Sequence, residues 1–485
     1  MSQVTIGIDV ATAGVRAVAV GATGRVLATA ACELPAPTRD AHGHSEQDAR
    51  TWWPATETAV GRVTAELPGR GAEVGAVAVA ATSGTIVAVD SRGEPVTPAL
   101  MYDDRRGATL NSRAAEYGAR RWRAMGMAVT PTAAIGRIAW LREAAPDAAG
   151  IKHTPELVGA KLLGETPATD SSHALKSGYD LLAHEWPADI FDRLGVPAHW
   201  LPDVVAPTTV LGEICSPVAG LPPGCLVVAG MTDGCAGQIA TGAVAPGQFV
   251  GILGTTYVLK GVTADLVPDP TGALYSHRHP DGWWLPGGAS NTGGEAIAGS
   301  PSITRLDAEA AARGPAATVT YPLTRTGERF PFVASDARGF TLGRPADDAE
   351  SHRSRLEGVA FVERLALDHL RRLGITVDAP LFAAGGGSRS AVWSRIRATV
   401  SGLGLRVAPR AESGYGAALL AAAASSPGGV ATVGAAWGTA EGTLIEPDPG
   451  ETDVMWESYR RFCAELHGRG WIDDDLLRCA TSNTG

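Results

Sequence analysis

The sequence predicts an α/β protein with at least two domains. A short apolar run at 226–229, followed by a turn that holds Asp233 and by a helix that begins near Ala236, is typical of a buried strand in an α/β sheet. A chain of 485 residues is too long for a single core, and its 45% hydrophobic residues can form more than one. An acid at the carboxyl end of such a strand lies where open α/β sheets place their ligands.

The first half of the chain opens with an antiparallel meander. Strands are predicted at 4–10, 15–20 and 25–30, with Asp9 and Thr12 at the first turn. The hairpin at 249–262 resembles a partial second copy of this meander, with Gly254-Thr-Thr in the place of Asp9-Val-Ala-Thr. We therefore hypothesise that the chain contains two related halves that face one another.

The remaining elements follow from hydrophobic periodicity and from turn residues. Strands are predicted at 74–81, 381–384 and 405–408, and helices at 138–144, 347–373, 393–400, 415–424 and 454–467. A further helix ends near Leu67 and has Ser45 and Asp48 as candidate N-caps. The segment 157–163 is compatible with a strand or a helix, and the polar tail from Asp473 is expected to be frayed.

Composition and charge exclude several classes of function. The net charge of −10 and the pI near 5.6 argue against a nucleic-acid partner, but they allow a local cationic site for a phosphorylated substrate. The six cysteines show no metal or disulfide spacing, which favours a reducing compartment. We expect a cytoplasmic protein without a membrane partner, because no secretion signal and no membrane-spanning apolar run is apparent. The sequence leaves open whether the protein is a monomer or a homodimer.

Four turns rich in Gly, Ser and Thr follow predicted strands, at 9–14, 254–256, 287–294 and 385–390. Each alone is more often a tight structural turn than a ligand site. Four of them, with acids at two strand ends, are hard to explain by turn chemistry alone, and small residues let backbone N–H groups approach a phosphate. The absence of a Gly-x-x-x-x-Gly-Lys-Ser/Thr loop disfavours a P-loop enzyme. The absence of Gly-x-Gly-x-x-Gly after the first strand disfavours a Rossmann dehydrogenase.

Several side chains have both a structural and a functional interpretation. Asp233 is either a helix N-cap or a base that takes a proton from an attacking hydroxyl, and Asp9 is either a turn former or a ligand of Mg²⁺. His277 and His279 lack a third clustered ligand, so a surface pair on a hairpin is favoured over a zinc site. Trp393 is by default a partly buried helix residue, although its position after a triple glycine also suits stacking on a purine.

Six segments together resemble the successive motifs of the FGGY carbohydrate kinases. They are GIDVATAGVR, Thr82-Ser-Gly, GMTDGCAGQ, GILGTTYVLK, GGASNTGG and AAGGGSRSAVW. The resemblance keeps the order of the motifs from Val4 to about Ala424. It implies two actin-like (ribonuclease-H-like) domains with a deep cleft between them, a sugar-binding domain at 1–243 and an ATP-binding domain at 244–485.

Within this family the chain is most similar to D-ribulose kinases of the cyanobacterial and plant type. Four segments carry this likeness: TSGTIVAVDSRGEP, SHALKSGY, YSHRHPDGWWLPGGASN and YPLTRTGERFPF. The Gln-Met-His segment typical of bacterial xylulokinases is replaced by Thr82-Ser-Gly-Thr. The resemblance implies a kinase that uses ATP and Mg²⁺ to convert D-ribulose into D-ribulose 5-phosphate. The alternatives are a xylulokinase, a kinase for another ketose or polyol, and a non-catalytic actin-like ATP-binding module.

The resemblance also implies roles for single residues on the sugar side. Asp233 is the general base, Asp9 positions Mg²⁺ and the reacting end of the sugar, and Ser83 hydrogen-bonds the ketose. The segment Tyr102-Asp-Asp-Arg-Arg resembles the Trp-x-Asp-x-Arg sugar loop of other family members. This match makes Asp104 and Arg106 candidate sugar ligands.

On the nucleotide side, the resemblance implies contacts with both ends of ATP. Thr12 lies near the transferring phosphate. The ATP phosphates contact Gly254, Thr255 and Thr256. Adenosine is held by Gly386, Gly387, Ser390 and Trp393, with Ser390 in the place of the Asn that is usual in the most similar group.

Overall fold

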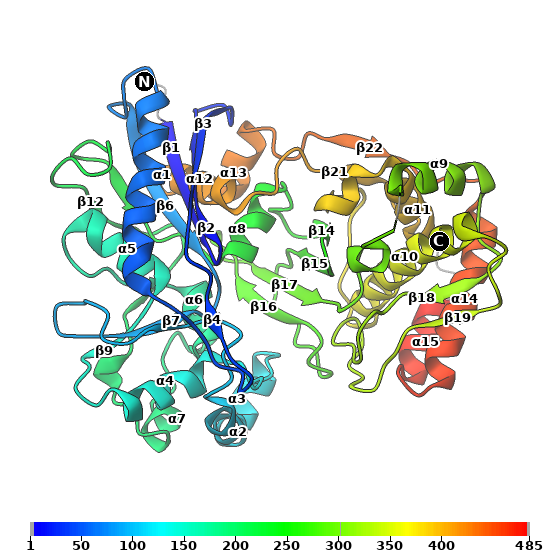
Figure 1. Ribbon diagram of the computed structural model, residues 1–485, viewed down its shortest axis with the longest axis horizontal. Coiled ribbons are helices and arrows are strands. Elements are labelled where there is room, and N and C mark those ends of the chain that lie inside the picture. Colours follow the sequence, from blue (N-terminus) through cyan, green and yellow to red (C-terminus); the bar gives the residue numbers. More distant parts are fainter. Residues whose placement is uncertain (1–3, 301, 483–485) are drawn as a thin grey trace. The chain divides into compact units, whose positions relative to one another are not determined.

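The computed structural model describes residues 4–300 and 302–482, which form two compact units (Figure 1). The first unit comprises the described residues up to Gly242 together with His277–Gly282 and Arg410–Thr439. The second unit comprises Ala243–Ser276, Trp283–Pro409 and the described residues from Ala440 onward. Two late segments of the chain thus belong to the first unit. A single domain boundary between residues 243 and 244 assigns both of them to the second domain.

A mixed six-stranded sheet forms the centre of the first unit, in the order β12-β13-β6-β1-β2-β3. Its strands are β1 (Val4–Ala11), β2 (Gly14–Val20), β3 (Val26–Glu33), β6 (Val74–Ala81), β12 (Val210–Glu213) and β13 (Leu226–Val228). β1, β6 and β13 run parallel, whereas β2, β3 and β12 are antiparallel to their neighbours. The parallel strands therefore bring three carboxyl ends to one edge of the sheet.

Helices cover both faces of this sheet, and the alternation along β6 explains how. The valines at positions 77 and 79 pack with α1 (Trp52–Glu66) and α5 (Thr154–Leu163). The alanines at positions 76, 78 and 80 face the other side and pack with α8 (Asp233–Ala240) and α12 (Ser413–Ala423). One face of the sheet is therefore built from branched side chains and the other from small ones.

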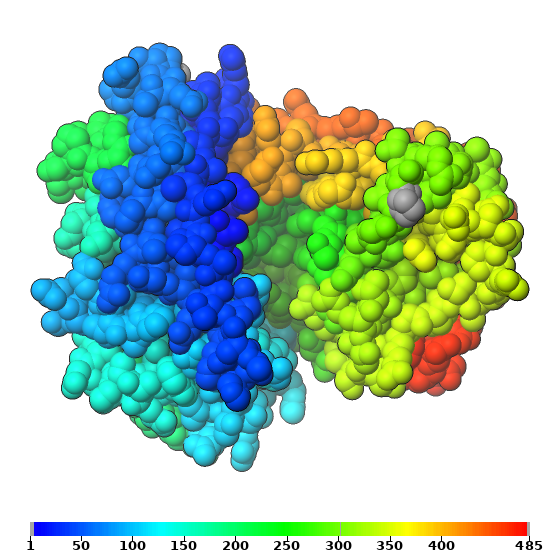
Figure 2. Space-filling view, in the orientation of Figure 1, coloured from blue at the N-terminus to red at the C-terminus, as the bar shows by residue number. Residues whose placement is uncertain are grey.

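The small-residue face allows α12 to lie unusually close to the sheet. A Cβ on Gly7 of β1 would be 1.8 Å from the carbonyl oxygen of Gly414, and a Cβ on Gly416 would be 1.8 Å from that of Ala236. Figure 2 shows the orange segment that contains α12 directly beside the dark-blue strands at the start of the chain. Only glycine fits at these contacts, so α12 is part of the core of the first unit.

A second, five-stranded sheet extends the first unit, in the order β4-β5-β8-β7-β9. Its strands are β4 (Thr38–Arg39), β5 (Ser45–Gln47), β7 (Ile86–Val89), β8 (Ala99–Leu100) and β9 (Gly150–His153). A separate hydrophobic cluster joins this sheet to α2 (Ala108–Tyr117), α3 (Ala119–Ala124), α4 (Ala134–Ala144) and α7 (Ala188–Arg193). The unit also contains the paired strands β10 (Thr169–Asp170) and β11 (Val204–Val205), the short helices η1 (Ala49–Thr51), α6 (Ser171–Lys176) and η2 (Ala198–Trp200), and the helix α13 (Gly429–Ala436).

The sheet of the second unit has the order β16-β17-β15-β14-β20-β21-β22. Its strands are β14 (Phe249–Leu253), β15 (Tyr257–Gly261), β16 (Tyr275–Arg278), β17 (Trp284–Ala289), β20 (Leu381–Ala384), β21 (Leu405–Val407) and β22 (Thr443–Ile445). β14, β15 and β17 form an antiparallel meander, β14, β20 and β21 run parallel, and β22 is an antiparallel edge. The meander corresponds to β1, β2 and β3 of the first unit, the three parallel strands correspond to β1, β6 and β13, and the edge strand corresponds to β12. This correspondence supports the hypothesis of two related halves.

The core of the second unit is built around the long helix α10 (Asp348–Arg372), for which Asp347 is the N-cap. The other elements of this unit are η3 (Gly294–Ile297), α9 (Ile303–Arg313), β18 (Val319–Tyr321), β19 (Phe340–Leu342), η4 (Gly386–Arg389), α11 (Ala391–Ser401), α14 (Thr452–Gly468) and α15 (Asp474–Thr481). α15 buries Leu476 and Ala480 and has Asp473 as its N-cap, so the prediction of a frayed tail is wrong. Both side chains join the hydrophobic core of the second unit.

A fully buried ion pair crosses this core. The Nε and Nη2 groups of Arg397 in α11 donate to both carboxylate oxygens of Glu363 in α10, at 2.5 and 2.8 Å. The same guanidinium donates to the carbonyl oxygen of Gly251 in β14 at 3.1 Å and to Oγ of Ser388 in η4 at 3.2 Å. One arginine therefore connects two helices, a central strand and a glycine-rich turn.

Other predictions were resolved by packing. The segment 157–163 is helical, as part of α5. His277 and His279 are only 4% and 1% exposed, so the expectation of a surface pair is wrong, although no cluster of three or more potential metal ligands occurs among the described residues. Within residues 4–300 and 302–482, no helix combines the length and the apolar character that a membrane span requires.

We expect Glu363→Ala to lower the free energy of unfolding by about 3–5 kcal/mol, because it leaves the guanidinium of Arg397 buried without its counter-ion. Urea denaturation followed by tryptophan fluorescence measures this loss. The control is Glu457→Ala, which removes an exposed ion pair with Arg460 (3.3 Å) and should leave the unfolding midpoint nearly unchanged. Equal, small effects of both substitutions would contradict the role assigned to the buried pair.

Candidate active site

Three polar side chains lie where neighbouring parallel strands of the first unit end. Asp9 is near the end of β1, Ser83 follows β6, and Asp233 begins α8 after the turn from β13. The last two ends are adjacent, since Ala81 forms an isolated parallel bridge with Thr232. The structure therefore collects these three predicted site residues at one edge of the sheet, the position that open α/β sheets use for ligands.

Asp9 has the electrostatic environment of a functional carboxylate. It is 6% exposed, and its Oδ1 atom is buried without a hydrogen-bond partner among the described residues. Its Oδ2 atom lies 3.6 Å from Nη1 of Arg16. Burial and then the negative charge of Asp233 raise the pKa of Asp9 to about 6, against the opposing effect of Arg16. The carboxylates of Asp9 and Asp233 are thus close enough to influence each other, as in a site that binds a cation or a proton donor.

Asp233 is held by the backbone around it. Thr232 occupies the N-cap position of α8, so Asp233 is the first helical residue and the N-cap interpretation is wrong. Its Oδ1 atom accepts a hydrogen bond from the N–H of Gly234 at 2.6 Å, and its carbonyl oxygen accepts one from Oγ of Ser413 at 3.0 Å. The preceding turn passes through Gly230, where φ is 82° and a Cβ would lie 2.0 Å from a carbonyl oxygen of β6.

Ser83 and Thr12 are half-buried at neighbouring strand ends. The Oγ atom of Ser83 is buried and makes no hydrogen bond to any described residue. Thr12 directly follows β1, and its carbonyl oxygen accepts a hydrogen bond from Nε2 of Gln47 at 3.0 Å. A buried hydroxyl without a partner is costly, so the position of Ser83 is suited to a ligand that completes its hydrogen bonding.

The predicted sugar ligands Asp104 and Arg106 are bonded to each other, which corrects the role of Asp104 and leaves that of Arg106 a prediction. The Asp104 side chain is completely buried, and its oxygens accept hydrogen bonds from the N–H of Ser45 (2.7 Å) and from the backbone N–H and Nε of Arg106 (3.0 Å each). Arg106 also donates to Glu46 at 2.7 Å and lies over the ring of Trp140. Asp104 therefore has no surface for a sugar, and the pair stabilises the loop that follows β8.

Two of the predicted glycine-rich turns pack directly on each other in the second unit. Gly254, Thr255 and Thr256 connect β14 to β15, and the first two of them are exposed. The N–H of Gly294 donates to the carbonyl oxygen of Gly254 at 2.8 Å, and the N–H of Glu295 donates to that of Thr255 at 3.0 Å. A Cβ on Gly294 would be 2.5 Å from the Gly254 oxygen, and a Cβ on Gly293 would be 2.4 Å from the carbonyl carbon of Thr256, so these two glycines allow the run at 287–294 to pack on the turn at 254–256.

The turn that follows β20 lies beside the turn that follows β14, because these strands are parallel neighbours. Gly385 has φ 87°, and a Cβ there would lie 2.5 Å from the carbonyl oxygen of Leu253. A Cβ on Gly387 would also collide with the Leu253 side chain, at 2.5 Å, whereas a Cβ on Gly386 would meet no atom within 4 Å. The second unit therefore brings together three of the four predicted turns.

The adenosine contacts predicted for Trp393 and Ser390 need correction. Trp393 is only 2% exposed, and its indole N–H donates to the carbonyl oxygen of Leu356 at 3.0 Å, so its ring offers no face for a purine. Ser390 is the N-cap of α11: its Oγ accepts from the N–H of Trp393 at 3.1 Å and donates to Oδ2 of Asp307 at 2.7 Å. Both residues fix the start of α11 rather than present a free group.

Three buried charged residues that support these sites were missed. Arg137 donates to the carbonyl oxygens of Leu100 (3.0 Å) and Met101 (2.6 Å), and burial lowers the pKa of Arg137 to about 10. Glu328 accepts from Oγ of Ser290 at 2.8 Å and from the N–H of Asn291 at 2.6 Å, which holds the 287–294 run. Asp170 caps α6, next to the strand ends of the first unit. The sequence signal for the burial of Arg137 was a single charged residue among apolar neighbours. The sequence gives no comparable signal for Glu328 or Asp170.

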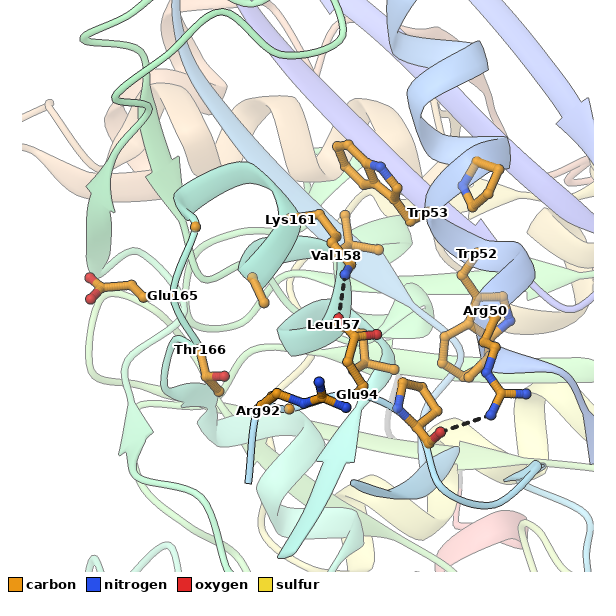
Figure 3. Close-up of a pocket in the computed structure, with 16 residues that line it drawn as sticks. Arg50, Trp52, Trp53, Arg92, Glu94, Leu157, Val158, Lys161, Glu165 and Thr166 are labelled. Atoms are coloured by element: carbon orange, nitrogen blue, oxygen red, sulfur yellow. Dashed lines mark hydrogen bonds and ion pairs between the residues drawn. The ribbon is translucent and has the colours of Figure 1, made fainter. Parts of the chain in front are cut away.

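Two cavities of similar size occur in the first unit. One, of about 510 Å³, is lined by Asp9, Arg16 and the segment 410–415. The other, of about 530 Å³, lies between the start of α1, the turn at 92–95 and the end of α5 (Figure 3). In the second cavity Lys161 is paired with Glu94 at 2.6 Å, and no predicted site residue lines it. Of these two cavities, only the one at Asp9 is lined by a predicted site residue, and neither Ser83 nor Asp233 lines it.

Comparison with known proteins agrees with this geometry. The N-terminal domain of the FGGY family of carbohydrate kinases matches residues 4–240, and the C-terminal domain of the same family matches residues 247–425. A xylulose kinase of Streptomyces rubiginosus is 29% identical over 453 residues, which cover 91% of this chain and 92% of that protein. A gluconokinase of Bacillus subtilis is 24% identical, with 82% of this chain and 83% of the relative covered.

A solved structure shows the same fold. The crystal structure of a xylulose kinase from Rhodospirillum rubrum superposes with a TM-score of 0.85 at 26% identity, covering 96% of this chain and 99% of the other. The two units are therefore the mixed α/β, actin-like domains of this fold. With both family domains matched in order, the chain belongs to the FGGY family of carbohydrate kinases.

Proposed function

We propose that the protein transfers the γ-phosphoryl group of ATP to a hydroxyl group of a ketopentose. The observation that carries the proposal is the meeting of Asp9, Ser83 and Asp233 at the ends of three neighbouring strands of the first unit. Phosphoryl transfer passes through a loose transition state, so the protein acts mainly by positioning the reactants and by balancing charge.

On the sugar side, Asp233 acts as the general base. It orients the attacking hydroxyl and accepts its proton as the new O–P bond forms. Ser83, whose Oγ has no partner among the described residues, donates to or accepts from a sugar hydroxyl. Neither role requires Asp104, because its carboxylate is already saturated within the protein.

On the nucleotide side, the turn at 254–256 of the second unit, in which Gly254 and Thr255 are exposed, contacts the ATP phosphates through its backbone. Gly386, which has open space around its Cα, marks where adenosine approaches the turn after β20. Gly387 shapes this turn against Leu253. Backbone donors suit this purpose, since they neutralise phosphate charge without side-chain rearrangement.

The residues present fit a Mg²⁺ ion that is delivered with ATP. Asp9 offers a buried Oδ1 atom without a protein partner, and the described residues contain no cluster of three or more potential ligands. A single carboxylate suits Mg²⁺, which commonly takes its other ligands from water and substrate phosphates. When bound, such an ion would neutralise phosphate charge, and Asp9 would be the carboxylate that holds it.

Among ketopentoses, we place D-xylulose first and D-ribulose second. The sequence alone favours D-ribulose, because Thr82-Ser-Gly-Thr replaces the Gln-Met-His segment of bacterial xylulokinases. The xylulose kinases matched over more than nine tenths of the chain favour the alternative. We give the full-length likeness more weight than the short segments that resemble D-ribulose kinases, since single loops can change without changing the sugar.

A panel of sugars in a coupled ADP-release assay tests the proposed substrate. We expect turnover with D-xylulose to exceed that with D-ribulose, L-ribulose, gluconate and glycerol in kcat/KM, because one arrangement of hydroxyls matches the fixed donors of the site. Higher kcat/KM with D-ribulose would reverse our order of the two ketopentoses. ATP hydrolysis that is independent of every sugar would contradict a sugar kinase and favour a non-catalytic ATP-binding module.

Asp233→Asn should lower kcat by about 10²–10⁴-fold, because the amide cannot accept the hydroxyl proton. The Kd for ATP, measured by calorimetry, should stay close to that of the wild type. Asp203→Asn, at an exposed position of the same unit, is the matched control and should keep normal turnover. Near-normal kcat for Asp233→Asn would remove this residue as the base.

A further inference from the structure

The short helix α6 lies between two of the strand ends that form the proposed sugar site. At its start, Oγ of Ser172 accepts a hydrogen bond from the N–H of Thr232, the residue before Asp233, at 2.8 Å. At its end, the Cβ atom of Lys176 would be 3.9 Å from a Cβ placed on Gly84, the residue after Ser83. α6 therefore borders both the Asp233 turn and the Ser83 turn.

The middle of α6 carries a buried histidine with an incomplete set of hydrogen bonds. The His173 side chain is completely buried, and its Nδ1 atom bonds to Oδ2 of Asp170. Asp170 is itself fixed, since its Oδ1 accepts from the N–H of Ser172 at 2.8 Å and from that of His173 at 3.2 Å. The Nε2 atom of His173 is buried and has no hydrogen-bond partner within residues 4–300 and 302–482. A buried polar atom without a partner costs about 1–3 kcal/mol, which a ligand atom could recover.

Charges around His173 favour its protonated form. Burial alone would lower the pKa of His173, but Asp170 and then Asp233 and Glu156 raise it above the ordinary value. The ring of His153 is the other titratable neighbour, at 5.9 Å between centroids, and the adjacent β11 contributes only valines. In the protonated ring, which the raised pKa favours, both nitrogens of His173 carry hydrogen, and Nε2 is then a donor.

His153 shows what a purely structural histidine looks like in the same cluster. Its Nδ1 atom bonds to Oε2 of Glu156 at 2.6 Å, and its Nε2 atom bonds to Oγ of Ser177 at 2.8 Å. Both nitrogens of His153 are thus satisfied inside the protein. His173 has the same burial and the same kind of carboxylate partner, but its second nitrogen is left for a group that the chain does not supply.

We propose that His173 is a specificity-determining residue of the sugar site, where its Nε2–H group donates a hydrogen bond to an oxygen of the bound ketose. Asp170 is the positioning residue that holds the ring, and Ser172 couples the same helix turn to the backbone that precedes Asp233. The inference rests on the proposed function, because it names a further contact to the same sugar. A rigid, charged donor rejects a sugar that lacks an acceptor at this point, since the donor would then stay buried and unpaired.

Steady-state kinetics of four proteins test this contact: wild type, His173→Gln, His173→Phe and His153→Gln. We expect His173→Phe to raise the KM for the ketose by about 10–100-fold, as for the loss of one hydrogen bond to a charged donor, with the KM for ATP unchanged. His173→Gln should recover part of the loss, because its amide N–H reaches in the same direction. His153→Gln should lower the thermal midpoint but keep the KM for the ketose.

The pH profile separates a direct contact from a structural role. His173 donates from Nε2 below its raised pKa, and the charged donor is lost as the pH rises through that value. The KM of the wild type for the ketose should therefore increase at alkaline pH, whereas that of His173→Gln should not. The KM of His173→Gln divided by that of the wild type should therefore fall as the pH rises. A constant ratio across the pH range would overturn the proposal.

The remaining outcomes distinguish the two levels of inference. If the wild type phosphorylates a ketose and His173→Phe folds with an unchanged KM for it, the contact is refuted and the kinase proposal stands. If His173→Phe does not fold, the ¹⁵N shift of His173 Nε2 in the wild type decides: it should move on addition of the ketose, and an unchanged shift would refute the contact. If the wild type phosphorylates no sugar of the panel, the proposed function and this inference fail together.

Discussion

In each unit, a glycine within two residues of the end of a parallel strand allows the chain to turn against the neighbouring strand, and the proposed ligand contacts depend on that turn. Gly230 follows β13 with φ 82°, and Gly385 follows β20 with φ 87°. A Cβ at either position would come within 2.0 or 2.5 Å of a carbonyl oxygen of the adjacent strand. No other residue fits without moving that strand, so the same constraint positions Asp233 in one unit and the turn at 386–390 in the other.

Hydrogen bonds from buried charged side chains then fix the turns that the glycines allow. In the second unit, Arg397 joins Glu363, the carbonyl oxygen of Gly251 and Ser388, so that it connects the strand before one turn with the helix after another. In the first unit, the hydroxyl of Ser172 accepts a hydrogen bond from the N–H of Thr232 and donates one to Oδ1 of Asp170 at 2.5 Å. A buried ion pair adds little stability relative to apolar packing. If one partner moves away, however, the other charge stays buried and unpaired at a high cost in free energy. This cost favours one arrangement of the turns.

Local pattern was sufficient to predict several of the main elements and the positions of the glycine-rich turns. The meander at β1–β3, the long helix α10 and the glycine-rich turns follow from periodicity and from backbone requirements that neighbouring residues reveal. The burial of Trp393 and of Asp104 could not be predicted in this way, because it depends on Leu356 and on Ser45, which are distant in sequence. For the same reason a motif identified the glycine turns well but assigned ligand contacts to side chains that the fold uses internally.

The position of α12 has a consequence for how the chain folds during synthesis. The alanine face of the first sheet is covered by a helix that ends at Ala423, whereas the rest of that unit is nearly complete at Gly242. At about 5–20 residues per second, the intervening stretch takes on the order of 10–40 s to emerge from the ribosome. For that time the alanine face of the sheet lacks the helix that covers it in the folded unit, so an apolar surface stays exposed until α12 has been synthesised.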